Sequence, residues 1–315
     1  MLIGTLPTLM GDRSLIISEQ MIAHSAVSGV RYNTGGDSPF NPKEILFRIK
    51  KLTDKYKKVL YVDLEGRQLR IAHWTPHDSG VITLNRSFDV SPPARAHIRN
   101  VGWFDLIAAN LKQRKIYLEN GPELGEYYFG ESQSVHVVGG GFRVQGYLGG
   151  LDTQYIEAAI ALGINHFMLS FFETSSDAKE FYQRFPRDIR AKQKVIFKIE
   201  SQKGLEEIAR IKLTSQQNLM AARDDFFLSY GGRSAEVITG LKKIISADPN
   251  AIVASGLLSG LQTAGMLSVN DISDVFLMIK MGYKNFMFSD GWARKFQEAA
   301  EFWMQIISYL RNETL

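Results

Sequence analysis

Short apolar runs alternate with amphipathic segments along most of the chain, and this rhythm predicts repeated strand–helix units. The runs are rich in β-branched and aromatic residues, which is typical of buried parallel strands. We predict eight strands, at Leu2–Leu6, Val27–Tyr32, Val59–Val62, His166–Leu169, Val195–Ile199, Asn218–Ala222, Ala251–Ala254 and Asn285–Phe288. Helices are predicted at Ile16–Ile22, Pro42–Tyr56, Thr153–Leu162, Asp177–Phe185, Lys203–Lys212, Ser234–Ala247, Asp271–Met281 and 292–311.

Eight such units predict an α/β fold, a (β/α)₈ TIM barrel formed by residues 1–70 and 146–315. Residues 71–145 break the rhythm and carry short alternating runs at Gly80–Leu84, Lys115–Leu118 and Val135–Val138. We therefore predict a small, β-barrel-like lid domain inserted after the third strand. Its turns include Asn120-Gly121-Pro122 and Gly139-Gly140-Gly141. The glycine triplet is interpreted as a hairpin or hinge, because no helix follows it to form a phosphate site.

Composition narrows the classes of function. The 315 residues are 45% hydrophobic and carry a formal net charge of +4 without a basic and aromatic stripe, so nucleic acid is not an expected partner. No cysteine is present, which excludes disulfides and favours a reducing compartment. No apolar run approaches membrane-spanning length and no signal peptide is recognised, so we expect a soluble cytoplasmic protein. A homo-oligomer stays open, and Phe296, Phe302 and Trp303 on the last helix are assigned to the core.

Polar residues cluster where the predicted strands end. In a barrel of this kind, chemistry gathers at the C-terminal ends of the strands. Lys198 and Glu200 are two positions apart on one strand, so they point the same way and need a partner if buried. A structural ion pair is the alternative for this pair alone, but the whole ring favours a functional site. The ring comprises Arg31, Asn33, Asp63, Ser170, Lys198, Glu200, Arg223, Asp225, Ser255 and Ser289.

Two carboxylates of this ring, Glu200 and Asp225, lie on neighbouring strands and suit Mg²⁺ or Mn²⁺ with open positions for substrate oxygens. Arg31 and Lys198 could then stabilise a phosphoryl group, a carboxylate or an enolate. Zinc is not expected, because the histidines His24, His97, His136 and His166 are interpreted as structural or superficial.

At this point the sequence resembles the pyruvate kinase family. Lys198-Ile-Glu200-Ser-Gln-Lys-Gly204 resembles the active-site strand of that family, K-I-E-N-x-E-G. Further matches follow in the same order and with similar spacing from residue 2 to about residue 300. They pair Arg31-Tyr-Asn33 with R-x-N-x-S-H-G, Asp63-Leu-Glu-Gly66-Arg-Gln-Leu-Arg70 with D-T-K-G-P-E-I-R, Ile116-Tyr-Leu-Glu-Asn-Gly121 with I-Y-V-D-D-G, Phe167-Met-Leu-Ser170-Phe171 with A-S-F, Ala222-Arg223-Asp224-Asp225 with A-R-G-D, and Val253-Ala-Ser255-Gly-Leu-Leu258 with V-A-T-Q-M-L.

The resemblance implies a role for each matched residue. Glu200 and Asp225 would hold Mg²⁺ against pyruvate or phosphoenolpyruvate, and Lys198 would neutralise the phosphoryl group in flight. Arg31 and Ser170 would bind the phosphate, and the turn of Arg223 and Asp224 would bind the substrate carboxylate. Ser255 would lie near the enolate carbon that gains a proton. Asn33 and Arg70 would bind the nucleotide, and Asn33 and Asp63 would form a monovalent-cation site. Residues 71–145 would form a mobile lid that excludes water.

The sequence departs from the family around this centre. Asp224 replaces the glycine of A-R-G-D, and Gly35 and Gly36 replace a serine and a histidine. Leu64 stands where the family has a threonine in its cation site, which argues against dependence on K⁺. Glu65 stands where the family motif D-T-K-G has its lysine. No counterpart of the C-terminal regulatory domain is recognised, so sugar-phosphate regulation is not expected.

Three hypotheses follow. The chain is a kinase-like phosphoryl or enolpyruvyl enzyme with a related substrate, a Mg²⁺-dependent lyase or aldolase of a 2-oxo acid, or a non-catalytic relative that binds a metabolite or partner. Lys198, Glu200 and Asp225 match the family, which favours the two enzymatic hypotheses.

Overall fold

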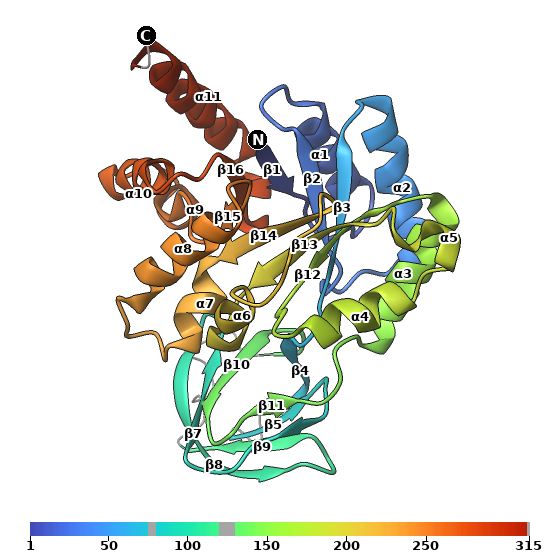
Figure 1. Cartoon of the computed structure of the whole chain (residues 1–315), viewed down its shortest axis with the longest axis vertical. Helices are drawn as coiled ribbons and strands as arrows, with labels where there is room; N and C mark the ends of the chain where they lie inside the picture. The colour runs from blue at the N-terminus through green and yellow to red at the C-terminus, as the bar shows by residue number, and fades with distance from the viewer. Residues whose placement is uncertain (75–79, 120–129, 314–315) are drawn as a thin grey trace.

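Eight parallel strands form a closed barrel (Figure 1). The computed structural model describes residues 1–74, 80–119 and 130–313. The barrel strands follow one another in chain order, and the last pairs with the first. They are β1 (Leu2–Thr5), β2 (Gly29–Asn33), β3 (Val59–Leu64), β12 (His166–Leu169), β13 (Lys194–Ile199), β14 (Gln217–Ala222), β15 (Ile252–Ala254) and β16 (Asn285–Phe288). The predicted α/β class and strands are confirmed, and the arrangement is compatible with a TIM-like barrel.

Helices connect these strands and cover the outside of the barrel (Figure 1). Eight of the helices in the described residues are α1 (Asp12–Ala23), α2 (Pro42–Lys55), α3 (Gly150–Leu162), α4 (Ser175–Gln183), α6 (Gln202–Glu207), α8 (Glu236–Ala247), α10 (Val269–Lys280) and α11 (Phe296–Glu313). Short helices are α5 (Arg187–Arg190), α7 (Arg223–Ser229), α9 (Ser259–Thr263) and a 3₁₀ helix at Asp290–Arg294. Local chemistry sets some of these ends: α2 starts at Pro42 because the side chain of Asn41 accepts a hydrogen bond from Glu44 N, at 3.0 Å.

Some helix predictions were wrong in extent. Helix α6 ends at Glu207, five residues before the predicted Lys212, and Glu207 is held by hydrogen bonds from the backbone and hydroxyl of Ser175. The unpredicted α7 begins directly after β14, so Asp225 lies in its first turn. On α11, Phe296 and Trp303 are buried and Phe302 packs against the core, as expected.

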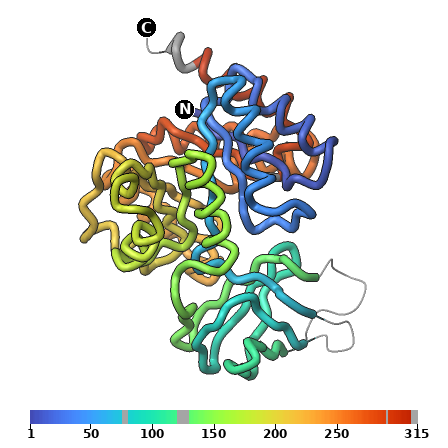
Figure 2. Tube along the Cα trace, turned by 90° about the vertical axis from the view of Figure 1, so that its right-hand side faces the viewer, coloured from blue at the N-terminus to red at the C-terminus, as the bar shows by residue number. Residues whose placement is uncertain are grey.

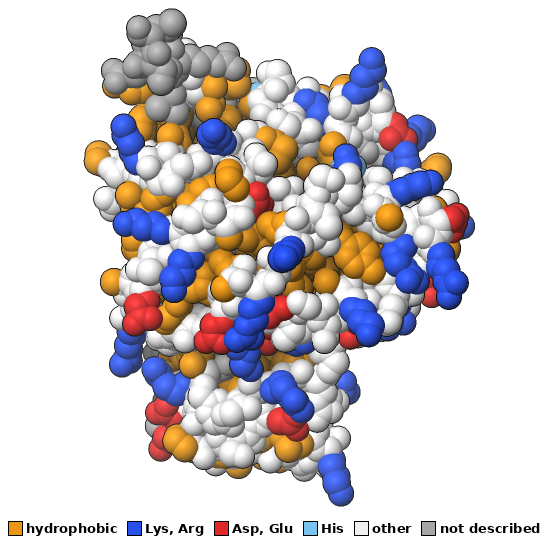
Figure 3. Space-filling view, in the orientation of Figure 1, with side chains coloured by type: hydrophobic (Ala, Val, Ile, Leu, Met, Phe, Trp, Pro, Cys, Tyr) orange, Lys and Arg blue, Asp and Glu red, His pale blue; other side chains and the backbone are white. Residues whose placement is uncertain are grey.

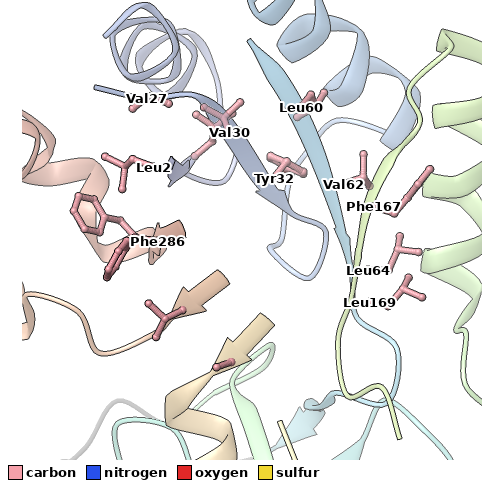
Figure 4. Close-up of a cluster of buried hydrophobic side chains, with 14 of the residues drawn as sticks. Leu2, Val27, Val30, Tyr32, Leu60, Val62, Leu64, Phe167, Leu169 and Phe286 are labelled. Atoms are coloured by element: carbon pink, nitrogen blue, oxygen red, sulfur yellow. The ribbon is translucent and has the colours of Figure 1, made fainter. Parts of the chain in front are cut away.

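The period-two alternation of the strands divides the core into two layers. Side chains on one face of each strand meet the helices, and Figure 4 shows examples: Leu2, Val30, Tyr32, Leu60, Val62, Leu64, Phe167, Leu169 and Phe286. The opposite faces fill the barrel interior with Ile3, Tyr61, Met168, Ile196, Met220, Ile252, Ala254 and Met287. The interior is therefore apolar through most of its depth.

A second closed barrel of six antiparallel strands is inserted between β3 and α3. Its strands are β4 (Leu69–Trp74), β5 (Val81–Leu84), β7 (Ala94–Ile98), β8 (Gly102–Asn110), β9 (Lys115–Leu118) and β10 (Ser134–Gly139), and β6 (Phe88–Asp89) pairs with β11 (Arg143–Val144). Because the chain enters it from the C-terminal end of β3, this barrel lies beyond that end of the parallel strands (Figures 1 and 2).

The second barrel differs in detail from the prediction. Strand β4 begins at Leu69, two residues before the expected start of the insertion. Strands β7 and β8 were missed. Two of the three buried positions of β7, Ala94 and Ala96, are small, and only Ile98 is a large apolar residue, which gives a weak alternating pattern. The Gly139–Gly141 turn joins β10 to β11, but these strands pair with other strands and not with each other, so the turn is not a hairpin. Asn120-Gly121-Pro122 lies outside the described residues.

One arginine fixes both connections between the barrels. Arg86 donates hydrogen bonds to the carbonyl oxygens of Gly66, on the entering connection, and of Tyr147, on the leaving one. The second of these is 3.0 Å long. Gly66 has a φ of +54°, and a Cβ there would lie 2.3 Å from the carbonyl oxygen of Ser170, so only glycine fits.

No helix in the described part of the chain combines the length and the apolar content that a membrane crossing needs.

Replacing Arg86 with alanine is expected to loosen both connections, because the carbonyl oxygens of Gly66 and Tyr147 lose their donor. Amide hydrogen exchange should accelerate by about ten-fold or more in residues 66–70 and 145–149 and stay unchanged in the parallel strands. Arg114→Ala, on the exposed side of the second barrel, is the matched control. If the amides of residues 66–70 and 145–149 exchange at the same rate in both variants, Arg86 does not hold the connections.

His166, on β12, predicts a pH dependence of stability. Burial, helped by the charge of Lys194, lowers the pKa of His166 to about 4, and its ring packs edge-on against Tyr61 at 5.5 Å. The unfolded chain binds a proton near pH 6.5, so stability is lost as the pH falls from about 6.5 towards 4. Urea unfolding at pH 7.5 and at pH 5.0 measures this. Between these two pH values, the free energy of unfolding should fall less in His166→Phe than in the wild type. His73→Phe, which replaces an exposed ring, should lose as much as the wild type.

Candidate functional site

The polar residues at the strand ends lie on the same inward-facing side of each strand as the apolar residues that fill the barrel. The apolar residues Ile3, Tyr61, Met168 and Ile196 are each followed, two positions later, by Thr5, Asp63, Ser170 and Lys198. These four side chains therefore form a polar top layer on the apolar filling, at the C-terminal mouth of the barrel. All four are buried.

Asp63 is the centre of this layer. Its Oδ2 accepts hydrogen bonds from Arg31 Nε at 2.6 Å and Lys198 Nζ at 3.2 Å, and its Oδ1 accepts one from Ser170 Oγ at 3.2 Å. Burial alone would raise the pKa of Asp63, but the charges of Lys198 and Arg31 outweigh burial and lower it. Asp63 thus stays ionised and holds both cations.

Thr5 supports Arg31 and was not predicted as a site residue. Its hydroxyl donates to the carbonyl oxygen of Phe288 at 2.6 Å and accepts from Arg31 Nη1 at 3.3 Å. The signal was present in the sequence, because Thr5 ends the first strand as Asp63 ends the third.

Lys198 and Glu200 converge, as their spacing predicted. Lys198 Nζ donates to Ser170 Oγ at 2.8 Å and lies 3.1 Å from Glu200 Oε1. The ammonium group has three hydrogens, and its three close neighbours are Asp63, Ser170 and Glu200. Only 6% of Lys198 is exposed. The lysine therefore pairs the acids internally, which a structural ion pair would also do.

Glu200 carries an unfavourable negative charge. Burial raises the pKa of Glu200 to about 7, and the charges of Asp225 and Asp63 act in the same direction against the lowering by Lys198. Its Oε2 accepts a hydrogen bond from Phe171 N at 2.6 Å. Phe171 has a φ of +49°, a left-handed conformation that costs about 1–2 kcal/mol in a non-glycine residue. This strained turn directs an amide at Glu200.

Asp225 meets residues of the second barrel. Arg99 Nη2 lies 3.8 Å from Asp225 Oδ2. His136 and His97, which are opposite each other on β10 and β7, both interact electrostatically with Asp225. Burial lowers the pKa of His136 to about 4, so its ring is neutral at neutral pH. His97 and His136 were interpreted as structural or superficial, and their interaction with Asp225 brings both close to a candidate site residue.

Arg223, Asp224 and Ser255 form a separate group, with the first two at the start of α7 and Ser255 directly after β15. Arg223 makes a two-pronged contact with Asp274, at 2.6 and 2.8 Å, and donates from Nε and Nη2 to the Ser255 carbonyl oxygen at 3.0 and 2.7 Å. Asp224 is exposed, and Ser255 has a φ of +67°. Arg223 is therefore engaged within the protein, and the substrate-binding roles of these residues stay predictions. Ser289 accepts a hydrogen bond from Gln262 at 3.0 Å.

Arg70 and Asn33 lie on a third side, near β2 and β3. Arg70 is ion-paired with Glu65 and donates to Gln68 Oε1 and to the Ser132 carbonyl oxygen, both at 2.9 Å. A Cβ on Gly35 would lie 2.2 Å from Arg70 Nη2, so the glycine makes room for this ion pair. Asn33 Oδ1 accepts a hydrogen bond from Gly35 N at 3.2 Å. Gly35 and Glu65, two departures noted in the sequence, thus belong to one contact.

Glu200 and Asp225 are the candidate ligands for a divalent cation. Glu200 and Asp225 are both buried and repel each other, which a bound cation would relieve. Across residues 1–74, 80–119 and 130–313, no group of three or more His, Cys, Asp or Glu side chains could hold a metal. Mg²⁺ commonly uses one or two carboxylates and completes its shell with substrate oxygens and water. The oxygens of Asp63 are occupied by Arg31, Lys198 and Ser170. Both oxygens of Glu200 also have protein partners, since Oε1 lies 3.1 Å from Lys198 Nζ and Oε2 accepts a hydrogen bond from Phe171 N.

Comparison with known proteins finds no matching family model and no matching curated protein. The pyruvate kinase resemblance therefore rests on the motifs quoted above.

Removing the lysine should leave buried carboxylates unpaired. We expect Lys198→Met to lower the free energy of unfolding by about 3–5 kcal/mol at pH 7.5. The double variant Lys198→Met/Glu200→Gln should recover a large part of that loss, since it removes one of the stranded charges. Urea unfolding of the wild type, both single variants and the double variant measures this. A loss in the double variant equal to the sum of the single losses would show that the two residues do not interact.

Proposed function

We propose that the chain is a divalent-metal-dependent enzyme that acts on a 2-oxo acid, or on its enol phosphate, through an enolate. In this proposal the fold is a (β/α)₈ TIM barrel, and the second barrel is its lid. The observation that carries the proposal is the buried cluster of Lys198, Ser170, Asp63 and Glu200 beside Asp225, at the C-terminal strand ends.

The charges of the cluster suit this chemistry. Glu200 and Asp225 would hold Mg²⁺ or Mn²⁺, which supplies positive charge to the oxygens of a bound acid. Lys198 and Arg31 present fixed cations to the same region, already oriented by Asp63. Such preorganised charges stabilise an anion that builds up during the reaction, because they need not reorient. The second barrel would exclude water from the site.

A pyruvate kinase-like phosphoryl transfer is one form of this chemistry. Arg31 and Ser170 would bind the phosphate, Lys198 would neutralise it in flight, and Ser255 would lie near the carbon that gains a proton. Asn33 and Arg70 would face the nucleotide. Positioning and electrostatics would supply most of the rate.

A Mg²⁺-dependent lyase or aldolase of a 2-oxo acid is the second candidate, and the contact between Arg70 and Glu65 favours it. A nucleotide polyphosphate needs free cations, but Arg70 is already paired with a carboxylate. Cleavage or formation of a carbon–carbon bond through an enolate needs no nucleotide.

Exchange of the methyl protons of pyruvate in heavy water tests enolate formation. With Mg²⁺ present, the wild type should catalyse deuterium incorporation, followed by proton NMR, and a chelator should abolish it. Glu200→Gln should slow the exchange by about 10²-fold or more, because a ligand charge is lost. Glu157→Gln, on the exposed face of α3, is the matched control.

No exchange with pyruvate or other 2-oxo acids would overturn the enzymatic proposal and favour a non-catalytic binding protein. Pyruvate release from phosphoenolpyruvate with a nucleoside diphosphate would support the kinase-like form. Proton exchange without that release would support the lyase or aldolase.

A further inference from the structure

A cavity of about 420 Å³ lies between the two barrels. One side is formed by the loops after β12 and β13, where Phe171 and Ser201 directly follow Ser170 and Glu200 in the chain. The other side is formed by β10, β11 and the turn between them. Acidic and basic side chains gather along the junction of the two barrels on the face in Figure 3. The cavity therefore adjoins the candidate site.

The lining of the cavity is suited to an apolar group. Its walls include the apolar residues Leu69, Val135, Val137, Phe142, Val144 and Phe171. Two of its cations are paired: Arg67 with Asp177 at 2.5 Å, and Arg143 with Asp89 at 3.5 Å. The remaining charged residues are of both signs: Lys203, Glu173 and Glu206. These residues leave no excess of positive charge to bind a phosphate or a nucleotide.

Two residues connect the cavity to the candidate site. Phe171 lines the cavity and donates its amide to Glu200. His136 also lines the cavity, interacts electrostatically with Asp225, and has its ring 5.9 Å from that of Phe171. No hydrogen bond from another described residue reaches the His136 ring. His136 is thus a polar group that a ligand could contact at the boundary between cavity and site.

We propose that this cavity binds a hydrophobic substituent, aromatic or branched aliphatic, of the acid whose anionic end is held near Lys198. The substrate would then be a 2-oxo acid, or its enol phosphate, larger than pyruvate. The volume falls in the range of about 300–1,000 Å³ that is typical of sites for organic ligands, well beyond the needs of a three-carbon acid. This inference rests on the proposed function for the anionic end of the ligand.

The test compares acids that share an anionic end. Isothermal titration calorimetry of the full chain with Mg²⁺ measures the Kd of pyruvate, 4-methyl-2-oxopentanoate and phenylpyruvate. The two larger acids should bind about ten-fold or more tightly than pyruvate, because they bury additional apolar surface. The same titrations are then made with two variants that narrow the cavity, Gln202→Trp and Glu206→Trp. Both residues are exposed, so the variants should fold.

The expected result is that the preference for the larger acids is lost in both variants, while the affinity for pyruvate stays unchanged. Gln183→Trp, on the exposed end of α4 and outside the lining, should keep the preference. Equal affinities of the three acids in the wild type, or a preference retained in both cavity variants, would overturn the proposal.

Two outcomes separate this inference from the proposed function. Proton exchange from pyruvate without any preference among the acids would overturn the cavity proposal and leave the proposed function in place. If the wild type binds none of the acids, the proposed function fails, and benzyl alcohol then tests the cavity alone. Ligand-observed NMR should show its binding to the wild type and its loss in Gln202→Trp; no binding to the wild type would overturn the cavity proposal too.

Discussion

The site depends on the burial of charges at one end of an otherwise apolar barrel. Asp63 makes this burial possible because its carboxylate is shared by Arg31, Lys198 and Ser170. The group that gathers there has two cations, Arg31 and Lys198, and three carboxylates with Asp225 included. Arg99 adds a third cation at the edge of this group, 3.8 Å from Asp225. Burial raises the pKa of Glu200, and the charges of Asp225 and Asp63 act in the same direction. In the proposed function, a divalent cation beside Glu200 and Asp225 would lessen the repulsion between these two carboxylates.

The second barrel takes part in the electrostatics of the site. Arg99, in the turn after β7, approaches Asp225, and His136 interacts with Asp225 and packs against the ring of Phe171. The anchoring of both connections by Arg86 keeps these residues over the mouth of the parallel barrel. A small shift of the second barrel would change the charge around Asp225, so the position of this barrel and the affinity for a cation should be coupled.

The sequence was sufficient for features set by local periodicity. Lys198 and Glu200 were predicted to point together because side chains alternate along a strand. Asp63 and Ser170 were found because they stand at the ends of predicted strands, where a barrel of this kind gathers its chemistry. Arg99 and His136 could not be found, since their approach to Asp225 depends on how a separate closed barrel is placed over the first. The pairing of Arg223 with Asp274 likewise depends on the packing of α10, which lies 51 residues further along the chain.

Two departures from the pyruvate kinase motifs, Gly35 and Glu65, make physical sense together. Gly35 leaves space that Arg70 and Glu65 fill, so the side of the mouth near β2 and β3 is occupied by an internal ion pair. Beyond β12 and β13, by contrast, an apolar cavity is open beside Glu200. A ligand anchored at Lys198 has room to extend towards that cavity and meets paired charges in the other direction. The residues proposed to bind the anionic end of the ligand are kept, while the space beside them lies towards β12 and β13 and not towards β2 and β3. This arrangement is expected if the proposed enolate chemistry is kept and the rest of the substrate has changed.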